Sequence, residues 1–233
     1  MIDLIQNFIF FTDVSIFSLL NFFFTLSIVL IFRRFSHYLN IKTYSGIQAI
    51  HTTTTPRLGG LTIFLGLLIF YFFSESSLMT ANVHSLLSTL LLFGGIIIFL
   101  SIKEDIFHNT SPTFRIACIS IPTFLYFYLT DYVLPVVDLP ILKDILAIPV
   151  LALLFYSLAV ISISNGFNFI DGSNGISGVT AFCSFSCLLF LAITINDSSI
   201  AIISCMYLVF IFVFLLFNYP FGKIFLGDSG AYF

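Results

Sequence analysis

Three polar clusters stand at the ends of long apolar stretches and contain residue types that could do chemistry. They are the charged run 103–105, the Asn- and Gly-rich segment 165–175, and the segment 227–230 with Asp228 inside it. Carboxylates beside hydrocarbon are costly and are usually retained for a function. If the three clusters face the same side of a bilayer, they can converge on one site, and converging acidic groups suit a metal ion.

The elements that must position these clusters are helices of membrane-spanning length. Of 233 residues, 59% are hydrophobic, 8% are charged and 32 are Phe, which argues against a water-soluble domain. Several apolar stretches run for about 17–20 residues, enough for a helix to cross roughly 30 Å of hydrocarbon. We predict an all-α, polytopic integral membrane protein that forms a single domain over residues 1–233. Its seven predicted spans are residues 14–32, 58–74, 85–101, 114–131, 145–163, 176–195 and 200–217.

The distribution of charge predicts which side each loop faces. With seven spans, the loops after the first, third, fifth and seventh spans share one side, and they hold seven of the eight Lys and Arg residues. Such residues accumulate in cytoplasmic loops, so we expect the N-terminus outside and the C-terminus in the cytoplasm. Glu104, Asp105, Asp171 and Asp228 then face the cytoplasm, and the other acidic residues lie outside. This combination suits an anionic, metal-bound substrate such as a nucleotide diphosphate.

A hydroxyl-rich segment leads into the second predicted span and ends in Pro, Arg, Leu and two Gly residues. It contains His51 and Thr55, followed by Arg57, whose planar guanidinium can hold a phosphate. The Gly residues would let a ligand approach the backbone closely. The alternative is a flexible interfacial loop in which Arg57 reaches toward the headgroups.

Two clusters contain candidate ligands at short spacing. Asn168, Asp171 and Asn174 follow one another at intervals of three, so they share one face if a helical turn continues through them. The alternative is a turn-rich loop. Glu104 and Asp105 are adjacent at the end of the third span, where one of them could act as a base or help to organise Mg²⁺. Solvated carboxylates at a helix end are the alternative for this pair.

Asp228 lies in a Gly-Asp-Ser-Gly segment of the kind that surrounds the nucleophile of secreted serine proteases. The sequence around it is not β-rich, and the four Cys residues lie within apolar spans, where they are interpreted as small buried hydrophobes. We therefore expect Asp228 to be a hard oxygen ligand for Mg²⁺. Phe225 precedes it by three residues and could stack on a base if the segment is helical, although core packing is the alternative.

Together these segments resemble the polyprenyl-phosphate N-acetylhexosamine-1-phosphate transferases. Four ordered motifs carry the resemblance, which covers nearly the whole chain: His51 with Thr55-Pro56-Arg57-Leu58-Gly59-Gly60; Glu104-Asp105 with Ser111, Pro112 and Arg115; Asn165, Asn168, Asp171-Gly172 and Asn174-Gly175; and Phe225-Leu226-Gly227-Asp228-Ser229-Gly230. The order of the motifs and the predicted topology also match those of the family.

The resemblance implies transfer of a sugar-1-phosphate from a UDP-sugar to undecaprenyl phosphate, with release of UMP. It implies Mg²⁺ as the cofactor, which Mn²⁺ could replace, with Asp228 as a metal ligand and Asn168 as a second one. It places Asp171 and Phe225 at the uridine and assigns activation of the lipid phosphate to the pair Glu104 and Asp105. The remaining residues that it assigns to substrate binding are His51, Thr55, Arg57, Asn168 and Asn174.

The resemblance also implies partners and a location. The partners are the UDP-sugar, undecaprenyl phosphate and the lipid bilayer, with no nucleic acid; a homodimer is compatible with the sequence. We expect a multi-pass protein of the bacterial inner membrane with a cytoplasmic active site. Glu104 stands where Asp is the commoner residue of the family, and Asn174 stands where Asp is frequent in the peptidoglycan branch. Both residues resemble the branch that begins O-antigen or another surface glycan.

The length of the chain suggests two further expectations. Family members continue past the Gly-Asp-Ser-Gly motif through additional spans and a loop with His and Arg, so we expect this chain to be C-terminally truncated and to have little transferase activity alone. The alternatives are a non-catalytic remnant or a transporter. A transporter predicts charges within spans or inverted repeats, whereas the carboxylates here cluster at span ends.

Overall fold

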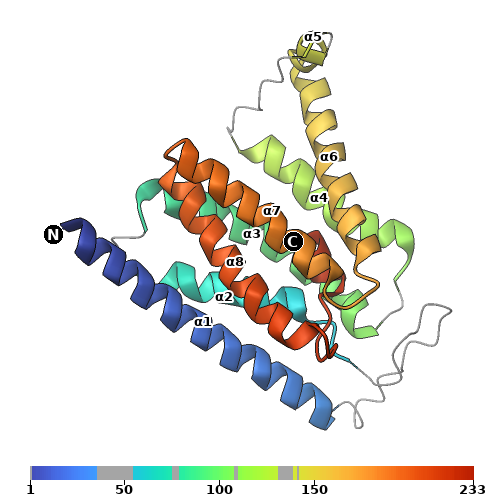
Figure 1. Cartoon of the computed structure of the whole chain (residues 1–233). Helices are drawn as coiled ribbons and strands as arrows, with labels where there is room; N and C mark the ends of the chain where they lie inside the picture. Colours follow the sequence, from blue (N-terminus) through green and yellow to red (C-terminus); the bar gives the residue numbers. More distant parts are fainter. Residues whose placement is uncertain (1, 36–54, 75–78, 108–109, 131–138, 141) are drawn as a thin grey trace.

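The computed structural model of the chain describes residues 2–35, 55–74, 79–107, 110–130, 139–140 and 142–233. Within these ranges the chain forms helices and no strand (Figure 1). In chain order the helices are α1 (Ile2–Phe35), α2 (Gly59–Phe73), α3 (Ala81–Phe107), α4 (Pro112–Leu129), α5 (Leu142–Leu146), α6 (Pro149–Ile170), α7 (Ile176–Thr194), α8 (Ser198–Asn218) and α9 (Gly227–Tyr232).

The predicted class, an all-α polytopic membrane protein, is confirmed. Each predicted span overlaps at least one helix, and four of the helices, α3, α6, α7 and α8, are long and apolar enough to cross a bilayer. The ranges Ser15–Ile31 and Gly59–Phe73 are shorter apolar helical stretches. Membrane crossing by α1, α2 and α4, and the side that each terminus faces, stay predictions.

Two predicted helix bounds differ from the structure in a way that matters for the site. Helix α3 continues beyond the predicted end at residue 101 to Phe107, so Glu104 and Asp105 lie inside its last turns. The predicted span 145–163 is divided: α5 ends at Leu146, and α6 runs from Pro149 to Ile170. Hydropathy marks where hydrocarbon ends, whereas the backbone hydrogen bonds of a helix continue into polar sequence.

Helix α8 forms the centre of the bundle. It packs against α1, α2, α3 and α7, and its side chains Phe210 and Phe214 are fully buried together with Leu67 and Phe70 of α2. The outer helices keep many large apolar side chains exposed, as at Phe99. In water such a surface would be unstable, but in a bilayer the lipid tails cover it.

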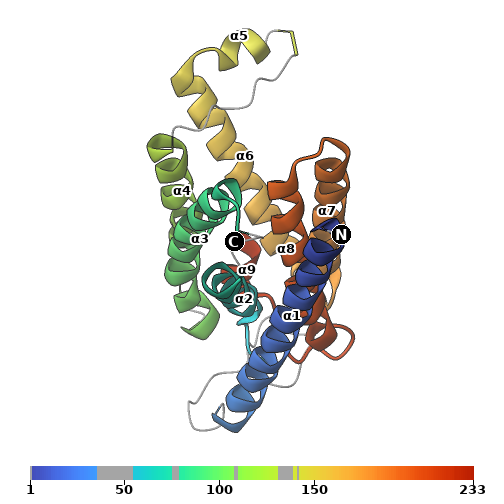
Figure 2. The ribbon, with the colours of Figure 1, turned by 90° about the vertical axis from the view of Figure 1, so that its left-hand side faces the viewer.

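The short helix α9 lies within the bundle rather than at its edge. It packs against α2, α3 and α6, and Figure 2 shows it surrounded by these helices. Asp228, Ser229, Ala231 and Tyr232 of α9 are all buried. The position of α9 therefore depends on helices that are distant in the sequence.

Candidate functional site

The first and last motifs meet through their backbones. The N–H of Phe225 donates to the carbonyl of Pro56 at 2.8 Å, the N–H of Gly59 donates to the carbonyl of Phe225 at 2.8 Å, and the N–H of Gly60 donates to the carbonyl of Leu226 at 2.9 Å. These hydrogen bonds hold the start of α2 and the residue before Arg57 against the two residues that precede α9. Phe225 is therefore not helical, and the helical spacing between Phe225 and Asp228 that would support base stacking is absent.

Two glycines allow α2 and α9 to touch. A Cβ atom on Gly60 would lie 2.1 Å from the Cα of Gly230, which is far closer than any real carbon contact. Side chains larger than hydrogen at either position would push the two helices apart. In the structure these glycines serve helix packing, whereas the sequence suggested that the glycines of the first motif let a ligand approach.

Asp105 joins α3 to the first turn of α9. Its Oδ1 accepts a hydrogen bond from the N–H of Asp228 at 2.7 Å, and its Oδ2 accepts one from the N–H of Ser229 at 3.0 Å. These N–H groups lie in the first turn of a helix, where they have no partner within the helix. Asp105 is 5% exposed, so the contact is sheltered from water.

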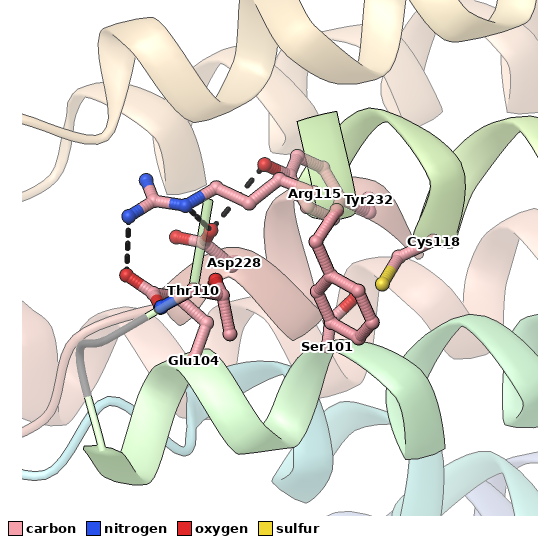
Figure 3. A pocket seen from close by; sticks show the side chains of 8 residues that line it. Ser101, Glu104, Thr110, Arg115, Cys118, Asp228 and Tyr232 are labelled. Atoms are coloured by element: carbon pink, nitrogen blue, oxygen red, sulfur yellow. Dashed lines mark hydrogen bonds and ion pairs between the residues drawn. The ribbon is translucent and has the colours of Figure 1, made fainter. Parts of the chain in front are cut away.

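Glu104, Arg115, Asp228 and Tyr232 form a charged cluster beside that junction (Figure 3). Nη2 of Arg115 is paired with Oε1 of Glu104, and Nε of Arg115 lies 3.7 Å from Oδ2 of Asp228. The Tyr232 hydroxyl donates to the same Oδ2 at 3.3 Å. Burial and the nearby Asp228 carboxylate hold the pKa of Tyr232 above its usual range, so the hydroxyl keeps the proton that it donates. We call Glu104, Asp105, Arg115, Asp228 and Tyr232 the acidic centre.

Thr110 completes the environment of Glu104. Its backbone N–H and its hydroxyl both donate to Oε2 of Glu104, at 2.9 and 2.6 Å. With Arg115 on the other oxygen, Glu104 is a paired, buried carboxylate instead of a solvated one at a helix end. The cost of burying this charge is offset by these bonds.

The pocket in the acidic centre is filled by its own side chains. It leaves no room for a water-sized sphere, and it is lined by Ser101, Glu104, Thr110, Phe114, Arg115, Cys118, Asp228 and Tyr232. Asp228 is 2% exposed, whereas the Arg115 side chain is 36% exposed. Arg115 is therefore the partner of Asp228 that is in contact with solvent.

Asp171 follows the last residue of α6 and faces the acidic centre. The hydroxyl of Ser177 donates to its Oδ1 at 2.5 Å. Burial is the main cause that raises the pKa of Asp171, to about 6, and the negative charge of Asp228 also raises it. The hydrogen bond from Ser177 and the positive charge of Arg57 lower it. Asp171 and Arg57 are therefore electrostatically coupled to each other and to Asp228.

Asn174 does not share a helical face with Asn168 and Asp171. Helix α6 ends at Ile170, and residues 171–175 form a turn before α7. We call these residues the α6–α7 turn. The side-chain amide of Asn174 donates to the carbonyl of Pro220 at 3.2 Å. The conditional expectation of a continuous helical turn is therefore wrong, because the Gly- and Ser-rich sequence after Ile170 favours a turn.

A second Asn supports the same region. Asn218 is 2% exposed; its Oδ1 accepts from the N–H of Gly175 at 2.6 Å, and its Nδ2 donates to the carbonyl of Ile224 at 2.8 Å. The hydroxyl of Thr55 donates to the carbonyl of Gly222 at 3.3 Å. Thr55, Asn174 and Asn218 thus hold the chain between α8 and α9 by hydrogen bonds to its backbone or to the turn beside it.

The remaining predicted residues are placed as follows. Asn168 lies in the last turn of α6 and is half-buried, and Phe225 is half-buried beside the first motif. Arg57 is half-buried, and its carbonyl lies 2.4 Å from where a Cβ of Gly227 would be. His51 lies outside the described residues. The substrate and metal roles of all predicted site residues stay predictions.

Four residues that contribute to the geometry were absent from the predicted site. Arg115 was recognised within a motif but was given no role. A cation that follows an acidic pair by about ten residues could have been predicted to form an ion pair with it. Thr110, Tyr232 and Asn218 gave no comparable signal, since hydroxyl, aromatic and amide side chains are common at helix ends. Thr110 and Asn218 bind residues on the other side of a connecting segment, and Tyr232 binds Asp228 from the next turn of α9.

The donor set is compatible with Mg²⁺ that binds together with a phosphate substrate. Among the described residues, no three His, Cys, Asp or Glu side chains are grouped so that they could hold a metal ion by themselves. Mg²⁺ commonly takes one or two protein carboxylates and completes its shell with water and substrate phosphate. Asp228 supplies a buried carboxylate at the point where the motifs meet, which fits that mode of binding.

Comparison with known proteins identifies a family. The family model of glycosyl transferase family 4 matches residues 86–233, more than half of the chain. The match includes the acidic centre and the α6–α7 turn. Residues of α1 and α2 lie before the matched range.

Two curated relatives carry related names, each of them provisional. A protein of Sulfolobus acidocaldarius, named as a UDP-N-acetylglucosamine–dolichyl-phosphate N-acetylglucosaminephosphotransferase, is 28% identical over 206 residues, covering 82% of this chain and 59% of the relative. A protein of Bacillus subtilis, named as an undecaprenyl-phosphate N-acetylglucosaminyl 1-phosphate transferase, is 22% identical over 188 residues, covering 80% of this chain and 50% of the relative. The chain spans between half and three-fifths of the length of these relatives.

Proposed function

Since this chain belongs to glycosyl transferase family 4, we propose that it transfers N-acetylhexosamine-1-phosphate from a UDP-sugar to a polyprenyl phosphate. One observation carries the proposal: the buried carboxylate of Asp228 lies where segments from α2, α3, α4 and α9 meet, beside the paired Glu104 and Arg115. The names of both relatives include a polyprenyl phosphate and an N-acetylglucosamine phosphate group.

The reaction makes one phosphorus–oxygen bond and breaks another. An oxygen of the lipid phosphate attacks the phosphorus atom that carries the sugar, and the bond from that phosphorus to the UMP oxygen breaks. UMP leaves with the bonding electron pair, and the sugar stays on the lipid as a diphosphate. Catalysis of such a step depends on positioning and on neutralising charge.

The residues of the acidic centre suit this task. Asp228, with Asn168 as a second ligand, would hold Mg²⁺, which neutralises diphosphate charge when bound. Arg115 is the mobile cation that can turn from Glu104 and Asp228 to a phosphate oxygen. We assign the uridine end of the donor to Asp171, which is coupled to Arg57, and we assign the proton of the lipid phosphate to Glu104 once Arg115 has turned away.

The finer assignment is to undecaprenyl phosphate and to the start of an O-antigen or another surface glycan at the cytoplasmic face of a bacterial inner membrane. Glu104 and Asn174, which stand in place of Asp, favour this branch. The Lys and Arg distribution favours the cytoplasmic side.

The test measures UMP release. Membranes from cells that express the protein from its own locus are incubated with Mg²⁺, undecaprenyl phosphate and a panel of UDP-sugars. We expect UMP release that requires both the lipid phosphate and an N-acetylhexosamine donor. Asp228→Asn should lower the rate by about a thousandfold, the order of an effect from losing a key electrostatic group.

A matched control uses an acidic residue far from the site. Asp197 caps α8 at its opposite end, where its carboxylate accepts from the N–H groups of Ser199 and Ile200. Asp197→Asn should keep the transfer rate. Absence of UMP release with every sugar would contradict the proposed reaction, and a near-normal rate for Asp228→Asn would contradict the role of Asp228.

A further inference from the structure

The two adjacent carboxylates of α3 have different kinds of partners. Glu104 is bound by the hydroxyl and N–H of Thr110 and by the side chain of Arg115, which is 36% exposed. Asp105 is bound by two backbone N–H groups of α9. A partly exposed side chain can leave its partner at low cost, whereas the backbone of a buried helix cannot.

The Asp105 contact has the geometry of a helix cap supplied by another helix. Both of its oxygens are engaged, at 2.7 and 3.0 Å, and the N–H groups belong to consecutive residues, Asp228 and Ser229. A capping carboxylate satisfies donors that the helix leaves unpaired and interacts favourably with the helix dipole. Because these N–H groups are buried, loss of the carboxylate would leave them unsatisfied.

The residue before Asp228 shows how close this approach is. Gly227 has a φ of +79°, and a Cβ on it would lie 2.7 Å from Oδ1 of Asp105 and 2.4 Å from the carbonyl oxygen of Arg57. Only glycine adopts this conformation readily and leaves room for the two oxygens. Gly227 and Asp105 therefore act as a pair that sets where the backbone of Asp228 stands.

We propose that Asp105 is a positioning residue whose carboxylate caps α9 and thereby holds Asp228 in place, and that it takes no part in proton transfer or in binding the metal. Its two oxygens are occupied by N–H groups of the segment that carries Asp228. Glu104 is then the member of the pair that faces the substrate. The inference rests on the proposed function for the role of Asp228 as a metal ligand, whereas the capping contact itself is independent of it.

The experiment compares Asp105→Asn with Asp105→Ala in the purified protein, with Mn²⁺ as the probe. An Asn side chain keeps one of the two acceptor oxygens that bind α9, and an Ala side chain keeps neither. We expect Asp105→Ala to weaken Mn²⁺ binding by about 10–100-fold, as loss of a supporting residue behind a metal ligand does. It should lower the metal-free unfolding midpoint by about 2–4 °C or more. Asp105→Asn should recover part of both losses, because it restores one of the two hydrogen bonds.

Asp197→Ala is the matched control, since Asp197 also caps a helix through two N–H groups, each at 3.0 Å. It should lower the unfolding midpoint by a similar amount and leave Mn²⁺ affinity unchanged. An equal loss of Mn²⁺ affinity in Asp197→Ala would overturn the inference, because the effect of Asp105→Ala would then be general. So would an Asp105→Asn variant with normal midpoint and normal Mn²⁺ affinity whose transfer rate is as low as that of Asp105→Ala.

The two proposals fail in different ways. If the unaltered protein binds no Mn²⁺, the metal role of Asp228 falls, but the order of the metal-free midpoints still tests the cap. If Mn²⁺ binds and the midpoints of Asp105→Asn and Asp105→Ala are equal to each other and to that of the unaltered protein, the cap falls and the proposed reaction stands.

Discussion

The acidic centre and the α6–α7 turn are both polar regions at helix ends, yet their polar side chains have different partners. In the acidic centre, carboxylates are matched with a guanidinium, hydroxyls and helix N–H groups. At the α6–α7 turn, Asn174 and the neighbouring Asn218 bind backbone groups. The difference shows that polar residues beside hydrocarbon are satisfied in two ways: carboxylates by cations, hydroxyls and helix N–H groups, and amides by the backbone of neighbouring segments.

Asp171 lies in the α6–α7 turn and is electrostatically coupled to Asp228 of the acidic centre. The pH dependence of its contribution to stability is the largest effect that we expect from either region. Burial raises the pKa of Asp171 to about 6, above the usual carboxyl range, so the folded state binds this proton more tightly than the unfolded state does. The contribution of Asp171 to stability is therefore least favourable above pH 6 and improves as pH falls toward 4.

We expect Asp171→Asn to stabilise the fold at pH 7 by about 2–3 kcal/mol, since one pKa unit corresponds to about 1.4 kcal/mol. The gain should shrink to a fraction of that value near pH 4 and vanish below about pH 3, where the carboxyl of the unaltered protein is neutral in both states. Unfolding of both proteins measured from about pH 3 to pH 8 checks this. A gain that is constant over this range would show that the pKa of Asp171 is not raised in the folded protein.

Arg115→Gln tests the charge balance of the acidic centre. The substitution leaves Glu104 and Asp228 without their shared cation, and we expect a loss of about 2 kcal/mol in the free energy of unfolding, moderated because Arg115 is partly exposed. Saturating Mg²⁺ should restore part of the loss, since a cation at Asp228 replaces the missing charge. Denaturant unfolding with and without Mg²⁺ measures both.

The matched control for Arg115 is Arg34→Gln, because Arg34 is exposed at the end of α1. It should change the free energy of unfolding by less than about 0.5 kcal/mol. Equal effects of the two substitutions would mean that the ion pairs of Arg115 contribute nothing measurable.

Asn174→Ala tests whether the α6–α7 turn is structural, and its effect is the smallest. Loss of the bond to Pro220 should cost about 1 kcal/mol. Because the bond fixes backbone, we expect the apparent affinity for the UDP-sugar to fall no more than about tenfold. Equilibrium unfolding and the donor KM are the measurements. A large rise in KM with unchanged stability would instead support direct contact between Asn174 and the nucleotide.

Much of the site was predictable because the motifs carry unusual residues at unusual depth. The clusters at 103–105, 165–175 and 227–230 stand out against apolar sequence, and charge counting placed them on one side. The structure brings Glu104, Asp171 and Asp228 into one region, as that prediction required. The helix bounds were less predictable, since polar residues such as Asn168 continue α6 past its apolar part.

The sequence alone determined that this protein is a bundle of apolar helices with a few carboxylates at their ends, because hydrophobicity and charge are properties of residues and their spacing. Only the tertiary structure decided which carboxylate meets which partner. Glu104 and Asp105 are neighbours in the chain, yet one faces Arg115 and the other caps α9. Successive residues of a helix point about 100° apart, so their partners come from different helices, and only the packing of those helices selects them.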